Sequence, residues 1–436
     1  MIRLKPTAET SHECPRCRLK LAPDGWLITG MRNLADLRCL QCGEEFYGDL
    51  PSGQALYTPI LLNKSSGAIY DYYSVGWFAD WLRDAYARRT NEPLRFEIKK
   101  FAKIEKKVVL LNCLDTLYGH SLLKLLNAQY YINRSDVSLI VLAPPFLEWL
   151  LPDGTAQAWI VDLPLRRGTE WNDWLAHKIN EQLEPFQEVF LSLGFSHPHA
   201  DDFEIERFTG IKPFSLENWS ESINKPCVTF IWRDDRLWET TAGGESQNRF
   251  GKIKGRFGKR RERTEDQLQK VIRFAECLRA EIPALDFAVA GIGEASGLPN
   301  WISDLRLKNL DAAAERAWCE RYARSHVVVG VHGSNMLLPS AHAGAVIELI
   351  NEDRWGNFLQ DILFRPSDFR EMFFRYRFVP HSTAPDELAR LAASVLRYED
   401  FRRLMSPEFC RHRENYDFRR FQSARGGGQI DEETRG

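Results

Sequence analysis

Short apolar runs alternate with amphipathic segments along most of the chain, and this alternation occurs twice. Apolar runs bounded by turn residues are typical of buried strands, and apolar residues spaced by one helical turn are typical of helices. Strands that alternate with helices favour a parallel sheet covered by helices on both faces. The expected strands are 107–111, 137–142, 159–163 and 188–191 in the first half and 227–231, 287–290, 327–331 and 345–349 in the second.

Breaks in this pattern divide the chain into parts. A proline-containing stretch at 195–225 indicates a linker between the two halves. Thr264 and Gln267 have the spacing of a capping box, which predicts a helix that starts at Thr264. Further helices are expected over 121–127, 171–183, 311–324 and 385–404. The expected domains are a cysteine module at 1–55, two α/β domains at 56–215 and 216–383, C-terminal helices at 384–425 and a disordered tail at 426–436.

Composition excludes several classes of protein. The 436 residues include 58 Lys and Arg against 60 Asp and Glu. The chain therefore has no overall positive charge that would favour a stable nucleic-acid complex. The 26 Phe, 13 Trp and 13 Tyr exclude disorder as the main state. No apolar run reaches the roughly 18 residues that a membrane-spanning helix requires. The N-terminus lacks the apolar run of a signal peptide, so we expect a cytoplasmic protein without a transmembrane segment.

Four of the nine cysteines form two close pairs near the start of the chain. Cys14 and Cys17 are separated by 21 residues from Cys39 and Cys42. Two such pairs suit a tetrahedral zinc ion in a zinc ribbon. A redox-active cysteine pair normally lies at the start of a helix that follows a strand. The residues around Cys14 and Cys17 do not have this pattern, so a redox role is not favoured. Four cysteine ligands leave no open position, so the predicted Zn²⁺ site is structural or binds a partner.

The strand at 327–331 leads into a turn of small and polar residues. Such a turn presents backbone N–H groups and a helix dipole to a phosphate, and Gly333 lets the backbone approach a ligand closely. Glu348 is expected at the end of the next strand, where a ribose would lie. The alternative is a tight turn with a packed histidine. The residues predicted to bind the cofactor or co-substrate here are His332, Gly333, Ser334, Asn335 and Glu348.

Arginines follow the first strand of the second half. Arg233 and Arg236 are expected at its carboxyl end, where guanidinium groups bind diphosphate oxygens and stabilise a leaving nucleotide diphosphate. The alternative is a surface ion-pair cluster with Asp234 and Asp235. A basic loop at 248–263, which contains Arg249, is a candidate to close over the diphosphate, to bind an anionic acceptor or nucleic acid, or to be merely solvated.

The first half has a matching polar segment. Asp115 and His120 follow the strand at 107–111 directly, so both are candidates for general acid–base catalysis at the carboxyl end of that strand. Capping or packing at the helix N-terminus is the alternative for His120.

The segment His332–Asn335 after a Val-rich strand, with a helix before it and the strand Ala345–Leu349 behind it, resembles the donor-domain signature of the family 61 and O-fucosyltransferase-like glycosyltransferases. The resemblance covers roughly 225–350 and excludes the cysteine module. It implies a GT-B-like α/β fold: two Rossmann-like domains facing a cleft, with the nucleotide-sugar in the C-terminal one. It also implies inversion of the anomeric centre and no catalytic metal.

Together these features predict a glycosyltransferase with an added N-terminal zinc ribbon. It would move a hexosyl or pentosyl group from a nucleotide-diphospho donor to a hydroxyl of a glycan, protein or small-molecule acceptor. The alternative is a non-enzymatic protein whose ribbon and basic loop hold nucleic acid or an anionic polymer. The sequence names neither the sugar, the base nor the acceptor.

Overall fold

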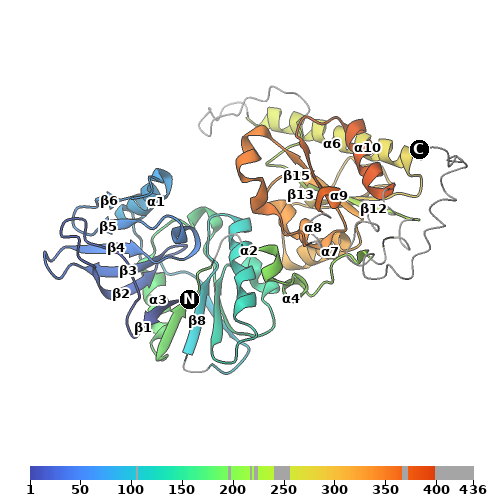
Figure 1. Cartoon of the computed structure of the whole chain (residues 1–436). Coiled ribbons are helices and arrows are strands. Elements are labelled where there is room, and N and C mark those ends of the chain that lie inside the picture. Colours follow the sequence, from blue (N-terminus) through green and yellow to red (C-terminus); the bar gives the residue numbers. More distant parts are fainter. Residues whose placement is uncertain are drawn as a thin grey trace, which may run out of the picture.

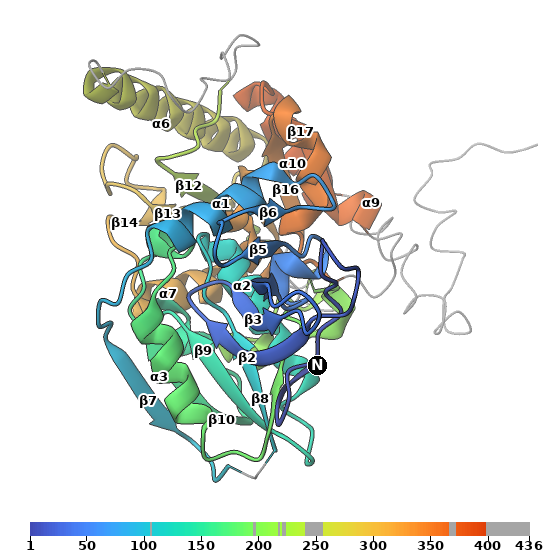
Figure 2. The same cartoon turned by 90° about the vertical axis from the view of Figure 1, so that its left-hand side faces the viewer.

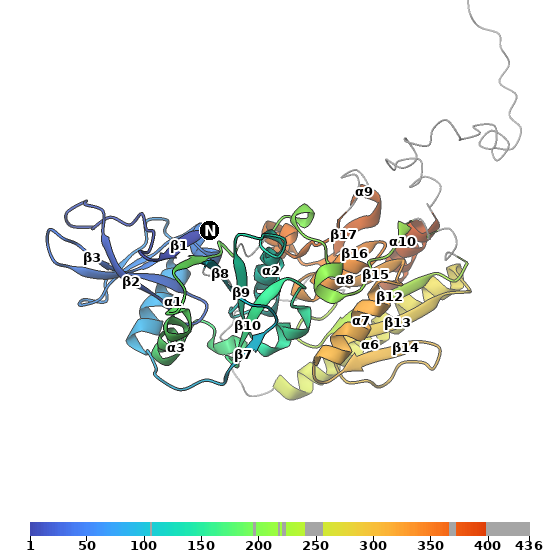
Figure 3. The same ribbon diagram turned by 90° about the horizontal axis from the view of Figure 1, so that it is seen from below.

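The computed structural model describes residues 1–104, 107–194, 198–216, 219, 224–239, 256–365 and 372–397. They form three parts along the chain, namely an N-terminal antiparallel sheet, a first α/β domain and a second α/β domain. Figures 1 and 3 show the first domain between the other two parts.

The second domain is built on a six-stranded sheet in which every pair of neighbours is parallel. Its spatial order is β14-β13-β12-β15-β16-β17. This is the strand order of a Rossmann domain, and it reverses direction between β12 and β15. The strands are β12 Cys227–Arg233, β13 Asp286–Ile292, β14 Ser303–Leu307, β15 Val327–Val331, β16 Val346–Ile350 and β17 Tyr376–Pro380.

Helices cover both faces of this sheet. Helices α6 and α10 share an apolar core with one face, whereas α7 and α8 lie on the other (Figure 1). The side chain of Asp311 caps α7 by accepting from the N–H of Ala314, as expected for a helix that starts there. The helical segments are α6 Arg256–Glu281, α7 Ala312–Tyr322, η7 Ser334–Met336, α8 Leu337–His342, η8 Glu352–Asp361, α9 Met372–Arg375 and α10 Pro385–Arg397.

The first domain has a sheet of order β1-β11-β8-β9-β10-β7, with four parallel central strands and antiparallel edges. The strand order reverses between β8 and β11. The strands are β1 Ile2–Lys5, β7 Phe96–Lys100, β8 Lys107–Asn112, β9 Ser138–Ala143, β10 Thr155–Val161 and β11 Glu188–Leu191. The helical segments are α2 Tyr118–Leu126, η2 Asn127–Tyr130, η3 Pro145–Leu150, η4 Leu165–Arg167, α3 Asp173–Leu183, η5 Ala200–Asp202 and α4 Glu206–Thr209.

The N-terminal sheet is a five-stranded antiparallel meander that stands in front of the first domain in Figure 2. It continues to Tyr70, beyond the module expected at 1–55. Its cysteines and Phe46 share an apolar core with β8 and β10 of the first domain, so the two parts pack as one body. Its elements are β2 Ala22–Ile28, β3 Asn33–Arg38, β4 Glu45–Asp49, η1 Gly53–Leu56, β5 Leu61–Asn63, β6 Ile69–Tyr70 and α1 Gly76–Ala87.

The two α/β domains are also joined by a continuous apolar core. Leu122 and Leu126 of α2 belong to the same cluster of buried residues as Trp318 of α7 and Leu337 of α8. The predicted α/β class and its two Rossmann-like domains in a GT-B-like arrangement are therefore confirmed. None of the helices within the described ranges is long and apolar enough to cross a membrane.

The start of α6 and the C-terminal residues were both subjects of predictions from the sequence. Helix α6 begins at Arg256 and runs past Thr264, so the predicted capping box is wrong and Thr264 lies inside the helix. The predicted tail at 426–436 and the last residues of the helix expected to end at 404 lie outside the described residues.

Candidate active site

The two arginines at the end of β12 contact the turn that follows β15. Arg233 Nη1 donates to Asn335 Oδ1 at 2.7 Å, and Arg236 Nη1 donates to the carbonyl oxygen of His332 at 2.5 Å. The strand order reverses between these strands, and their carboxyl ends form the crevice in which Rossmann domains bind ligands. The structure thus brings together two segments that are about a hundred residues apart in the sequence.

Helix α6 holds the arginine segment in place. Gln267 accepts a hydrogen bond from the backbone N–H of Trp238 at 2.8 Å and donates one to the carbonyl oxygen of Arg233 at 3.1 Å. Gln267 therefore fixes both ends of the loop that carries the arginines. This is a different role from the helix capping expected of it.

The alternative ion-pair cluster is present in part. Arg233 donates to both carboxylate oxygens of Asp235, at 2.8 and 2.6 Å. Burial opposes ionisation of Asp235, but the Arg233 guanidinium outweighs it and lowers the pKa of that carboxyl. Arg233 is mostly buried, whereas the Asp235 side chain is 69% exposed. Asp235 therefore covers the guanidinium from the solvent side.

Gly333 touches both arginines. Its φ is +146°, and a Cβ atom on it would lie 2.4 Å from Arg236 Nη1 and 2.8 Å from Arg233 Nη1. A side chain at this position would push the arginines away from the turn. Gly333 was expected to let a ligand approach the backbone closely. In the structure it is the guanidinium groups of the two arginines that approach the backbone there.

Glu348 lies within β16 and has no exposed surface, so the expected position at the lip of the sheet is wrong. One carboxylate oxygen lies 2.5 Å from His332 Nδ1, and the other accepts from the hydroxyl of Tyr376. His332 is itself almost completely buried. Glu348 therefore orients His332 and, through it, the turn that Arg236 binds.

The helix that follows this turn is short. After Gly333 come the single 3-10 turn η7 and the six residues of α8. The helix dipole is the sum of aligned peptide dipoles. A helix this short therefore contributes less to anion binding than we expected from the sequence. The arginines are the main source of positive charge at this edge.

In the first domain, Asp115 and His120 lie together after β8, where the order of that sheet reverses. His120 Nδ1 is 3.3 Å from Asp115 Oδ1, and Lys124 Nζ is 2.7 Å from Asp115 Oδ2. Burial raises the pKa of Asp115, but Lys124 and His120 outweigh this effect and hold it well below its usual range. Asp115 is thus a buried anion with a poor affinity for protons, whereas His120 remains one-third exposed.

The two candidate segments meet at the domain interface. A Cβ atom placed on Gly119, next to His120, would lie 2.5 Å from Ser334 Cβ. Gly119 is thus in direct contact with the turn of the second domain. The Asp115–His120 pair and the His332–Asn335 turn therefore border one junction between the carboxyl ends of the two sheets.

A pocket of about 400 Å³ lies between the two domains. Its walls come from the residues that follow β9 and β10, including Pro144 and Asp162, and from the start of α7, including Asp311 and Glu315. It contains no Lys or Arg among its lining residues. A pocket between domains at the strand ends is the place where enzymes with this fold take a ligand.

Glu315 ties the two domains together at the pocket, a role that was not predicted for it. Its oxygens accept from the hydroxyl of Tyr118 and, at 2.7 Å, from Nε1 of Trp149, both in the first domain. Burial raises the pKa of Glu315, although both hydrogen bonds oppose this. Arg316 stacks over the ring of Trp149 at 5.5 Å.

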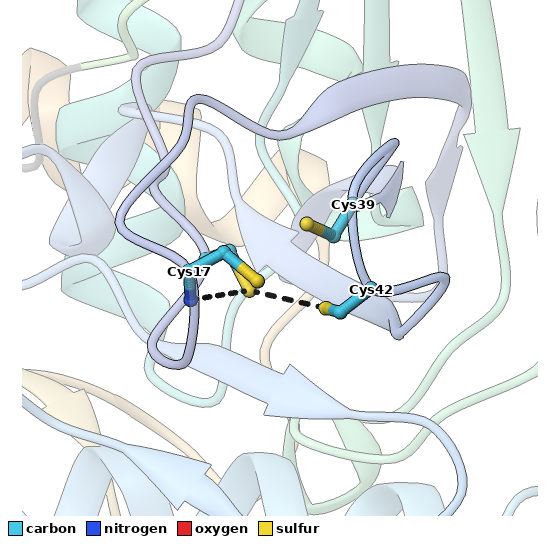
Figure 4. A group of neighbouring side chains, drawn as sticks. Cys17, Cys39 and Cys42 are labelled. Carbon is cyan, nitrogen blue, oxygen red and sulfur yellow. Dashed lines mark hydrogen bonds between the residues drawn. The ribbon is translucent and has the colours of Figure 1, made fainter.

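The four N-terminal cysteines converge on one point. Their sulfur atoms all lie within 4.8 Å of one another, and Cys14 Sγ and Cys42 Sγ are 3.7 Å apart. Figure 4 shows the sulfur atoms of Cys17, Cys39 and Cys42 turned toward a common centre. Zn–S bonds of about 2.3 Å in a tetrahedron place sulfur atoms about 3.8 Å apart. The donor set and spacing therefore fit a structural metal ion.

Each pair forms the same tight turn. The N–H of Arg18 donates to the carbonyl of Cys14, and the N–H of Gly43 donates to the carbonyl of Cys39, both at 2.9 Å. Arg18 and Gly43 have positive φ angles of 60° and 74°. The N–H of Cys42 lowers the pKa of Cys39 to about 7. Arg249 and the first half of the basic loop expected at 248–263 lie outside the described residues, whereas 256–263 form the start of α6, so the prediction of a loop there is wrong.

No protein-family model matches the chain, and no curated protein matches it. Among solved structures, it is similar to the ADP-heptose LPS heptosyltransferase II of E. coli, with 10% identity over 67% of this chain and 99% of that chain and a TM-score of 0.38. It is also similar to a protein from Listeria monocytogenes assigned as a UDP-N-acetylglucosamine 2-epimerase, with 11% identity over 69% and 68% of the two chains and a TM-score of 0.30. A third structure, described as trehalose-6-phosphate from E. coli bound with UDP-2-fluoro glucose, has 9% identity over 74% and 72% and a TM-score of 0.26. All three TM-scores are low. The fold is therefore assigned from the strand order and the side-chain contacts described above, and not from these similarities.

Proposed function

We propose that the chain is a glycosyltransferase that uses a nucleotide-diphospho sugar and works at the junction of its two Rossmann-like domains. The observation that carries this proposal is the placement of Arg233 and Arg236 at the switch point of the second sheet, bound to the turn that contacts Gly119, the residue next to His120 in the first domain. A cationic crevice suits a diphosphate, and a histidine next to it suits a proton acceptor.

In this proposal the arginines hold the diphosphate and stabilise its charge as it leaves. Arg236 supplies the main contact, because Asp235 already pairs with Arg233. A guanidinium group can replace a metal ion in this role, which supports transfer without a catalytic metal. Ser334 and Asn335, each half-buried, line the same crevice from the turn.

His120 is the proposed base, and Asp115 is its positioning residue. The lowered pKa of Asp115 makes it a weak base, but its negative charge orients the ring and stabilises the imidazolium that forms. The acceptor hydroxyl would approach from the interdomain pocket. A single displacement from that side inverts the anomeric centre.

The four cysteines are proposed to hold a structural Zn²⁺ that braces the N-terminal sheet against the first domain. All eight cysteines within the described residues are free, which supports a reducing compartment such as the cytoplasm. The alternative role in binding nucleic acid or an anionic polymer depends on the basic segment at 248–263, whose first half lies outside the described residues and whose second half belongs to α6, and it is not favoured.

The test is release of nucleoside diphosphate from a panel of nucleotide-sugars with the purified chain. We expect His120→Ala to lower the rate about 100- to 10,000-fold. Added imidazole should restore part of it. The matched control is His177→Ala, because His177 is exposed on α3. A His120→Ala protein with unchanged turnover would contradict the assigned base, and no turnover of any donor by the unmodified chain would contradict the proposed activity.

A further inference from the structure

A second pocket, of about 320 Å³, opens at the amino-terminal ends of the strands of the second sheet. Cys227 and Asp286, the first residues of β12 and β13, form its floor together with His326, which precedes β15. β12 has seven residues, and at a rise of about 3.3 Å per residue its two ends are about 20 Å apart. The pocket is therefore separate from the crevice at Arg233.

Part of the charge in this pocket is already balanced. Arg321 donates to both carboxylate oxygens of Asp286, at 2.9 and 3.0 Å, and its Nε donates to Thr229 Oγ1 at 3.0 Å. Arg321 is mostly buried, so this pair is a fixed and neutral part of the wall. Burial opposes ionisation of Asp286, but Arg321 keeps its pKa low.

Among the described residues that line the pocket, Lys225 and Arg324 leave a net positive charge. Both side chains line the pocket and are exposed, and both act on Asp286 from a distance. Within the ranges that the structure describes, no carboxylate lies at ion-pair distance from either of them. Two cations without an ion-pair partner among the described residues match the charge of about −1.5 to −2 that a phosphomonoester carries at neutral pH.

The pocket also reaches the linker between the two domains. Phe214 lines it, and the Phe214 ring packs edge-on against His326 and Trp219 with centroid distances of 5.0 and 5.6 Å. The backbone N–H of Phe214 donates to the carbonyl of His342 at 2.8 Å. A ligand here would contact the second domain and the linker at once, with an apolar ring beside the charged groups.

We propose that this pocket is a second ligand site, which binds a small phosphomonoester such as a sugar phosphate. Lys225 and Arg324 pair with the phosphoryl oxygens, and Phe214 covers the carbon skeleton. The volume is at the lower end of the range for small-molecule sites, which begins at about 300 Å³. Because the ligand bridges the linker and the second domain, its binding stabilises their packing.

Isothermal titration of the full chain with glucose 6-phosphate, inorganic phosphate and malonate tests this site. The titrations use an Arg236→Gln background, so that phosphate bound at the other crevice does not contribute. We expect saturable binding of one glucose 6-phosphate per chain, tighter than binding of malonate. The double variant Lys225→Gln/Arg324→Gln should weaken it by about tenfold or more.

The matched control is Lys308→Gln/Arg390→Gln, which removes the same charge from exposed residues elsewhere on the second domain. It should bind glucose 6-phosphate within about twofold of its parent. Absence of saturable binding, malonate binding as tightly as glucose 6-phosphate, or an equal loss in the control variant would each overturn the proposal. Thermal melts of both double variants establish that they are folded.

Discussion

Arg233 Nη1 lies 2.7 Å from Asn335 Oδ1, and this hydrogen bond ties the carboxyl ends of β12 and β15 together where the strand order reverses. The same guanidinium pairs with Asp235 on its solvent side. The crevice is thus organised before any ligand binds, because its arginines are held by the His332–Asn335 turn. The same turn would contact the bound ligand. Preorganised donors of this kind lose little free energy to rearrangement when an anion binds.

The contact between Gly119 and Ser334 predicts a steric limit at the domain interface. Gly119→Ala should destabilise the chain by about 1–3 kcal/mol, because the new Cβ would lie 2.5 Å from Ser334 Cβ. Urea unfolding measures this loss, and adding Ser334→Gly should recover part of it. Gly76→Ala is the control, since Gly76 begins α1 with no atom near its missing Cβ. Equal stability of the two single variants would contradict the interface described here.

The buried His332–Glu348 contact predicts a loss of stability as well as of activity. His332→Ala should lower the free energy of unfolding by about 3 kcal/mol or more, because the Glu348 carboxylate would lose its contact with His332 Nδ1 while it stays buried in the core. His332→Asn retains a donor near the Nδ1 position and should lose less. Chemical denaturation of both variants distinguishes them, and an unaffected His332→Ala would show that the pair does not hold the turn.

The cysteine cluster predicts about one zinc ion per chain. Metal analysis of the purified protein should find this ion, and Cys39→Ser should release it and lower the melting temperature. Cys277→Ser should leave the metal content unchanged, because Cys277 lies in the second domain outside the cluster. A protein without zinc that folds normally would rule out the structural metal.

His342 predicts how stability depends on pH. Burial lowers its pKa to about 4, although the carbonyl of Leu338 partly opposes this. The unfolded chain takes up a proton near pH 6.5 and the folded chain does not, so this residue's contribution is full above that pH and is lost as the pH falls toward 4. The loss is about 3 kcal/mol. Urea unfolding of His342→Asn between pH 7 and 4 should depend less on pH than that of the unmodified chain or of His177→Asn.

The regular part of the fold was predictable from the sequence because its strands are buried on both faces. The runs that became β8, β12 and β15 are almost entirely apolar, and Asp311 marks the start of α7 as its cap. The strand β14 escaped prediction because polar residues alternate with apolar ones at the edge of the sheet.

The site was only partly predictable, because its geometry depends on contacts between distant segments. Arg233 and the turn at His332–Asn335 were found from their positions after strands. Glu315 was not, since its partners Tyr118 and Trp149 lie more than 160 residues away in the sequence. Glu348 was misplaced because its strand extends one residue beyond the expected end, so Glu348 lies at the middle of β16, between β15 and β17.

The most direct test of the central claim is a thermal-shift panel of UDP, GDP, CDP and ADP, with and without magnesium. A nucleotide at about 100 times its dissociation constant adds about 2.7 kcal/mol of stability, which is readily measured. We predict that one nucleotide stabilises the chain without magnesium, that Arg236→Gln abolishes the shift, and that Asp235→Asn, which uncovers Arg233, increases it. No shift with any nucleotide, or an equal shift in Arg236→Gln, would contradict a diphosphate site at the switch point of the second sheet.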